Sequence, residues 1–139
     1  MTDEQLRKIL TSTKTIAAVG VSAKRERPSN AVCRFLQAQG YRVIPVNPAE
    51  TEVLGEKTFS SLDTIVEPVD LILVFRKPEF APELAEAAIR IGAKVFWLQD
   101  GAGNPAAAKR AEEAGLTAVV DDCLMRQFVR LAAIAPIAR

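Results

Sequence analysis

A short basic loop carries the most suggestive chemistry in this sequence. Residues 20–29 read GVSAKRERPS, in which three cations face a single acid. This basic loop leads from an apolar run into a helix whose start is marked by Pro28 and Ser29. The N–H groups and the dipole at a helix N-terminus attract phosphate. The residue types alone leave two interpretations open, a phosphate site or a solvated turn.

The familiar nucleotide-binding motifs are missing around this loop. Gly20 is followed by no second glycine within the loop, so the dinucleotide pattern GxGxxG does not occur there. The next apolar run ends in Asn47 and Pro48, where an NAD site uses Asp or Glu to bind the ribose. The P-loop pattern GxxxxGK followed by Ser or Thr is also missing. The sequence therefore disfavours both NAD and P-loop nucleotide hydrolysis.

Candidates for nucleophilic or metal chemistry are few. The chain has no histidine, which removes Ser-His-Asp and Cys-His catalysis, and its two cysteines do not form a CxxC pair. Cys123 begins the last predicted helix, where a thiol can have a lowered pKa, but Asp121 and Asp122 would oppose a thiolate there. Cys33 fits the core of the first crossover helix. We therefore predict no catalytic residue and no metal.

Composition and charge limit the partners. The 139 residues are 49% hydrophobic and 25% charged, which is typical of one globular domain, here residues 1–139. The 18 Lys and Arg are balanced by 17 Asp and Glu, so no broad basic face for nucleic acid is expected. No apolar run approaches a membrane span of about 20 residues, and the start MTDEQLRKIL is unlike a signal peptide. We expect a cytoplasmic protein that binds neither nucleic acid nor membrane.

Apolar runs and helix signals alternate along the chain. The predicted strands are residues 15–22, 41–47, 70–75, 94–99 and 116–120. A capping box at residues 2–5 predicts a short opening helix. The later predicted helices cover residues 29–39, 78–91, 106–114 and the segment from 122 onward. Residues 49–69 are predicted to form a connection with one helical turn near residues 60–62.

These elements predict a fold. Each strand is apolar enough for burial on both faces, which is typical of parallel strands joined by helical crossovers. We predict an α/β fold, a Rossmann-like doubly wound sheet of five mainly parallel strands with helices on both faces and strand order 3-2-1-4-5. Pro45 cannot donate to a ladder, so it favours an edge or a bulge for the second strand. Ligands of such sheets bind beyond the carboxyl ends of the strands.

Four segments together resemble one family. They are GVSAKRERPSNAV, GYRVIPVNP, VDLILVFRKP and DDC, and they occur in this order at the ends of successive predicted strands. They look like the small CoA-binding proteins related to the N-terminal domain of the succinyl-CoA synthetase alpha subunit. The resemblance spans nearly the whole chain. It implies a Rossmann-like fold whose first-strand loop, VNP turn and third-strand loop hold the phosphoadenosine and pyrophosphate of CoA.

The resemblance also implies roles for individual positions. The first turn would be lined by Gly20, Val21 and Ser22. Phosphate would be met by the cations and the helix start of the basic loop, which are Lys24, Arg25, Arg27, Pro28 and Ser29. Guanidinium groups, a hydroxyl and backbone N–H groups are suited to phosphate.

Three further loops complete the predicted site. Asn47 and Pro48 would border the adenosine. The next wall would be formed by Phe75, Arg76, Lys77 and Pro78. Phe75 ends an apolar strand, so it also fits the core. Gln99 and Gly101 could approach the pantetheine arm, although the same residues suit an ordinary strand-to-helix turn. The family tends to have an acid one turn after the last cysteine, where this chain has Gln127.

These observations favour a non-catalytic module that binds coenzyme A or acyl-CoA, with an acyl-CoA enzyme as its protein partner. The phosphohistidine and second domain of the synthetase have no counterpart in the sequence. Two alternatives stay open. One is an oxidoreductase-type domain for NAD(P) or another nucleotide, in which the basic loop takes a 2′-phosphate. The other is an interaction module whose ancestral pocket is empty.

Overall fold

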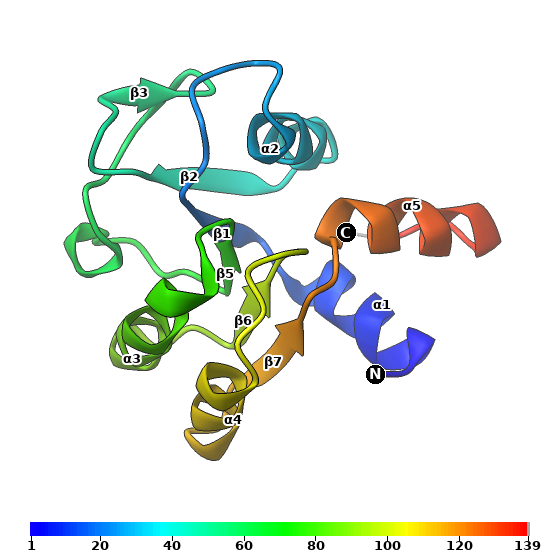
Figure 1. The fold of residues 1–139 in the computed structure, drawn as a ribbon. Helices are drawn as coiled ribbons and strands as arrows, with labels where there is room; N and C mark the ends of the chain where they lie inside the picture. The colour runs from blue at the N-terminus through cyan, green and yellow to red at the C-terminus, as the bar shows by residue number, and fades with distance from the viewer. Residues whose placement is uncertain (139) are drawn as a thin grey trace.

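The fold is built around a parallel sheet of five strands (Figure 1). The computed structural model describes residues 1–138. The strands are β1 (Thr15–Val19), β2 (Arg42–Val46), β5 (Leu71–Val74), β6 (Val95–Leu98) and β7 (Thr117–Val120). All neighbouring strands are parallel, and they lie in the order β2-β1-β5-β6-β7. The predicted α/β class and its five parallel strands are confirmed.

Helices cover both faces of this sheet, as predicted. One face carries α1 (Asp3–Ser12), α2 (Pro28–Ala38) and α5 (Leu124–Ile134), and the other carries α3 (Ala81–Arg90) and α4 (Pro105–Glu113). Successive side chains of a strand point to opposite faces, so Ile16 packs in the first layer and Ala17 in the second. Burial on both sides is the reason that the strands are continuously apolar.

The predicted strand order 3-2-1-4-5 is wrong. The third long strand, β5, pairs with β1 and not with β2, so β2 forms an edge and the order of the long strands is 2-1-3-4-5. The Pro45 carbonyl accepts from the Phe59 N–H at 3.0 Å on the side of β2 away from β1. A residue's N–H and carbonyl point to the same side of a strand, so the missing N–H of Pro45 faces that outer edge. A further strand there would lack a ladder donor.

The connection between β2 and β5 contains a hairpin that was not predicted. Its strands are β3 (Glu52–Val53) and β4 (Glu56–Lys57), joined by Leu54 and Gly55. Both turn residues have positive φ, 60° and 74°, as a primed two-residue turn requires. Leucine rarely adopts that conformation, so the usual Asn-Gly or Asp-Gly signal is missing. The predicted helical turn follows as a 3-10 helix over Leu62–Thr64.

The helix ends agree with the sequence signals to within a few residues. Thr2 and Gln5 form the predicted capping box, and Asn104 caps α4 by accepting from the Ala107 N–H at 3.1 Å. The helix predicted from Pro78 begins as a 3-10 turn, Pro78–Phe80, before α3. Within residues 1–138, none of the helices has the length and apolar character to cross a bilayer.

Candidate functional site

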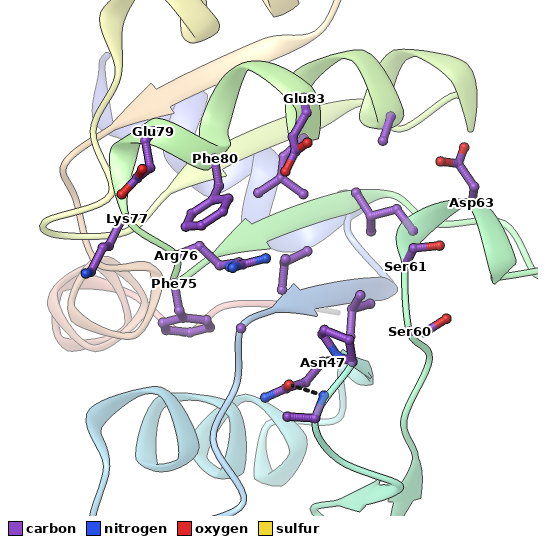
Figure 2. A pocket seen from close by; sticks show the side chains of 18 of the residues that line it. Asn47, Ser60, Ser61, Asp63, Phe75, Arg76, Lys77, Glu79, Phe80 and Glu83 are labelled. Atoms are coloured by element: carbon purple, nitrogen blue, oxygen red, sulfur yellow. Dashed lines mark hydrogen bonds between the residues drawn. The ribbon is translucent and has the colours of Figure 1, made fainter.

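A cleft of about 840 Å³ opens at the carboxyl ends of β1, β2 and β5 (Figure 2). The strand order reverses here, because β1 has β2 on one side and β5 on the other. Parallel sheets bind ligands at this type of position. The residues that directly follow the three strands, Gly20, Asn47 and Phe75, all line the cleft. The sheet topology therefore brings together loops that are about 30 residues apart in the sequence.

Arg76 projects into the cleft across Gly20. Its guanidinium carbon lies 3.7 Å from the centre of the Phe80 ring, and Figure 2 shows the side chain running beside that ring. Gly20 has φ +86°, and a Cβ built on it would lie 2.7 Å from Arg76 Cγ. Only glycine allows both this backbone conformation and this close approach. The first-strand turn and the third-strand loop are thus packed against each other.

Asn47 connects the end of β2 to the basic loop. Its Nδ2 donates to the Val21 carbonyl at 3.0 Å, and its Oδ1 accepts from the Ala49 N–H at 2.9 Å. Both ends of the amide are therefore engaged within the protein. The side chain also lines the cleft, and it holds the cleft and the basic loop in a defined relation.

The basic loop is ordered by its own hydrogen bonds. The Ser22 N–H donates to Ser29 Oγ at 3.0 Å, and Asn30 Nδ2 donates to the Ser22 carbonyl at 2.8 Å. Because Ser29 Oγ accepts this bond, its own hydroxyl hydrogen is left for another acceptor. The side chains of Lys24, Arg25, Arg27 and Glu26 are exposed. The loop thus holds a folded backbone below a cationic surface.

The structure brings only part of the predicted residues into the cleft. The predicted residues that line it are Gly20, Asn47, Pro48, Phe75, Arg76 and Lys77. Val21 is fully buried in the core. The adjoining basic loop holds Ser22, Lys24, Arg25, Arg27, Pro28 and Ser29, and Pro78 begins the 3-10 turn beside the cleft. Phe75 lines the cleft with part of its surface and also packs against the core.

Several lining residues were missed by the sequence analysis. They are Ser60, Ser61, Asp63, Glu79, Phe80, Glu83 and Arg90. Arg90 of α3 bonds the Asp63 carboxylate at 2.9 Å, and this hydrogen bond lowers the pKa of Asp63 below its ordinary value. The only sequence signal was the short apolar and serine segment at residues 60–62, which indicated a turn but no ligand contact.

The loop after β6, residues 99–104, lies outside the cleft lining and is held by intramolecular bonds. Gly101 N–H and Gly103 N–H both donate to Asp121 Oδ1, at 3.1 and 2.9 Å. Gln99 is buried, and its Oε1 accepts from the Leu124 N–H at 2.9 Å. We call this segment the tied loop. A contact of Gln99 or Gly101 with a pantetheine arm stays a prediction.

Both cysteines are buried free thiols. Cys33 lies in the core between α2 and the sheet, and burial raises the pKa of its thiol. Cys123 precedes α5, with 8% of its surface exposed, and its backbone N–H donates to Asp122 Oδ1 at 2.7 Å. The thiol of Cys123 makes no capping bond to the helix. Gln127, where the family tends to have an acid, donates to both Asp122 carboxylate oxygens at 3.1 and 3.0 Å.

Residues 14–128 match the family described as CoA binding domain. The chain belongs to this CoA-binding domain family. It is 41% identical over 120 residues to the uncharacterized protein YneT of Bacillus subtilis (strain 168), covering 86% of this chain and 89% of that protein.

Solved structures share the fold of this family member. A hypothetical protein from Pyrococcus horikoshii OT3 is 45% identical, with a TM-score of 0.92, and the match covers 95% of this chain and 93% of that one. A dinucleotide-forming acetyl-coenzyme A synthetase from Ca. Korarchaeum cryptofilum is 19% identical with a TM-score of 0.72. That match covers 84% of this chain and 28% of the synthetase chain, and it shows likeness of fold alone.

Proposed function

We propose that this protein binds coenzyme A or acyl-CoA at the carboxyl edge of its sheet and does not catalyse a reaction on it. The adenosine lies in the cleft, and the phosphates lie against the basic loop and the start of α2. Membership of the CoA-binding domain family supports the choice of ligand. The hydrogen bond from Asn47 to the Val21 carbonyl is the observation that supports this position of the ligand, because it joins the cleft to the basic loop.

Charge supports the position of the phosphates. Lys24, Arg25 and Arg27 are exposed and form no ion pair within the described part of the chain, unlike the arginines of α3 and α5. The N-terminus of α2 adds its dipole and the hydroxyl of Ser29. An unneutralised cationic loop beside a helix start is suited to the 3′-phosphate and the pyrophosphate of CoA.

The absence of catalysis in this proposal rests on the residue types. The chain has no histidine, the usual base that activates a catalytic Ser or Cys, and both cysteines are buried. A nucleophilic cysteine sits in a partly exposed, electropositive environment, whereas these thiols are buried. We therefore assign the protein a binding role.

Calorimetry with CoA, dephospho-CoA, NADP and ATP tests this function. CoA should bind most tightly, because only CoA combines an adenosine 3′-phosphate with a pyrophosphate and a pantetheine arm. Tighter binding of NADP would support the oxidoreductase-type alternative and overturn the proposal. Thermal shift supplies a second measurement, since ligand at a hundred times its Kd stabilises the folded state by about 2.7 kcal/mol.

Substitution of one cation in the basic loop tests where the phosphates bind. Arg27→Ala should weaken CoA by about tenfold to a hundredfold and dephospho-CoA much less, because one charged hydrogen bond to phosphate is lost. Lys8→Ala, at an exposed cation of α1, is the control and should leave both affinities unchanged. Equal losses of CoA and dephospho-CoA would place Arg27 at the pyrophosphate.

A further inference from the structure

Arg76 differs from the ion-paired arginines in what its guanidinium contacts. Arginines 42, 90, 110, 126 and 130 each bond a carboxylate. Within residues 1–138, Arg76 forms no such pair, although Glu79 and Glu83 line the same cleft. Its guanidinium lies against the Phe80 ring instead, 3.7 Å from the ring centre. With Phe80 on one side, the N–H donors of the guanidinium and its side away from Phe80 remain available to a ligand.

That opposite face belongs to the cleft. Figure 2 shows Arg76 pointing from the third-strand loop into the cleft, with Phe80 on one side and Phe75 and Asn47 on the other. Arg76 and Phe80 are both partly buried, which restricts the directions from which a ligand can reach them. A planar group that enters the cleft on the side of Arg76 away from Phe80 would meet the guanidinium, which the Phe80 ring holds in place from the other side.

We propose that Arg76, backed by Phe80, is the stacking platform for the ligand's flat base, which is adenine if the ligand is CoA. This inference rests on the proposed function and assigns Arg76 to the base and not to the 3′-phosphate. Guanidinium planes stack well on nucleobases because they are flat, delocalised and weakly hydrated. The exposed cations of the basic loop remain for the phosphates.

Gly20 is a positioning residue for this platform. The Arg76 chain crosses Gly20 so closely that a Cβ at this position would lie 2.7 Å from Arg76 Cγ. An alanine there would push the guanidinium away from Phe80. The first turn therefore contributes to base binding through the path of the Arg76 side chain, without itself contacting the base.

Ligand fragments separate the two roles of Arg76. We expect Arg76→Lys and Phe80→Leu each to weaken CoA and dephospho-CoA by the same factor, about fivefold to fiftyfold, because both ligands carry the base. Binding of 4′-phosphopantetheine should not change. Phe80→Tyr keeps the ring and should restore most of the affinity. Lys77→Ala, which removes the neighbouring cation from the same cleft, is the matched control and should have less effect than Arg76→Lys.

A spectroscopic measurement reports whether ligands that carry the base bind next to the platform. In the variant Phe80→Trp, adenosine 3′,5′-bisphosphate and CoA should quench the new indole fluorescence, whereas 4′-phosphopantetheine should not. The wild-type protein, whose Trp97 is buried, is the baseline. Quenching by the two base-containing ligands supports the platform.

The outcomes distinguish this inference from the proposed function. If the wild-type protein does not bind CoA, the proposed function fails. If it binds CoA but Arg76→Lys weakens CoA and spares dephospho-CoA, Arg76 contacts the 3′-phosphate and the platform is overturned. Unchanged affinities in Arg76→Lys and Phe80→Leu would also overturn it.

Discussion

The basic loop and the tied loop leave the same edge of the sheet but are held in different ways. In the tied loop, Asp121 accepts from two backbone N–H groups, and Arg126 pairs with Asp100 at 2.8 Å. In the basic loop, bonds from Ser22 and Asn30 hold the backbone, whereas the cationic side chains have no carboxylate partner within residues 1–138. Local charge is thus neutralised in one loop and available in the other.

This difference indicates how one sheet edge separates support from recognition. A loop whose donors and charges are satisfied internally contributes stability to the fold. A loop with an ordered backbone and unpaired cations can exchange contacts with water for contacts with an anion at little cost in ordering. We therefore expect substitutions in the tied loop to change the free energy of unfolding, and substitutions around the cleft and basic loop to change ligand affinity.

The largest effect is expected from Gly103→Ala. A Cβ at this position would lie within 2.4 Å of the Asp121 carboxyl atoms, so the two bonds that hold the tied loop must break or shift. We expect a loss of about 2 kcal/mol in the free energy of unfolding, measured by urea denaturation, with CoA affinity within about twofold of wild type.

A double-mutant cycle isolates the cause of this loss. In the background Asp121→Ala the carboxylate is gone, so Gly103→Ala should cost much less than it does in wild type. An equal cost in both backgrounds would mean that the backbone, and not the carboxylate, opposes the added methyl group. A large loss of CoA affinity would show that the tied loop also takes part in recognition.

A pair of asparagines gives a sharper comparison of intermediate size. Asn47→Ala removes the bond to the Val21 carbonyl and the bond from Ala49, and should reduce stability by about 1 kcal/mol. It should also weaken CoA severalfold, because the cleft and the basic loop lose their connection. Calorimetry and denaturation measure the two effects.

Asn104→Ala is the matched control for that change. Asn104 also uses both ends of its amide, donating to the Pro78 carbonyl and accepting from Ala107 N–H. Loss of this helix cap should cost a similar amount of stability, about 1 kcal/mol, but leave CoA affinity unchanged. Equal loss of affinity in the two variants would contradict the proposed division between the loops.

The smallest effect concerns two carboxyl groups, Asp63 in the cleft and Asp100 in the tied loop. Hydrogen bonds from Arg90 and Arg126 lower the pKa of Asp63 and of Asp100, respectively, below the ordinary value of 3.8. A lowered pKa in the folded state stabilises the protein above the unfolded pKa, and this contribution is lost as the pH falls through the folded value. Both pairs are more than one-third exposed, so solvent screens the contribution.

NMR titration of these carboxyl groups distinguishes the two regions. Arg126→Gln should raise the pKa of Asp100 toward its ordinary value while leaving CoA affinity unchanged. Saturating CoA should raise the pKa of Asp63, because an anionic ligand disfavours a nearby carboxylate, and should leave that of Asp100 unchanged. A shift of Asp100 alone would place the ligand at the tied loop.

Much of the fold was predictable because it depends on local signals. The capping box at Thr2 and the Asn104 cap are confirmed, since capping is decided within one turn of helix. Alternating apolar runs and helices predicted five parallel strands covered on both faces, because burial on two sides leaves a continuous apolar pattern.

The candidate site was predictable in part for a related reason. Loops that follow parallel strands meet at one edge, so Gly20, Asn47 and Arg76 could be expected to lie together. Phe80 and Arg90 could not, because they reach the cleft from the helical segments after β5 and have no motif of their own. The 54–55 turn was also missed, since a leucine at positive φ carries no turn signal.

The sequence by itself determined which segments form the five long strands and the helices, where helices begin, and which loops leave the binding edge, because each of these depends on nearby residues or on the period of burial. Only the tertiary structure decided that β5 lies beside β1, that the Arg76 guanidinium lies over the Phe80 ring and that the Arg76 side chain passes close to Gly20. Strand neighbours and side-chain approaches depend on contacts between segments far apart in the chain, and one residue's type does not specify its distant partner.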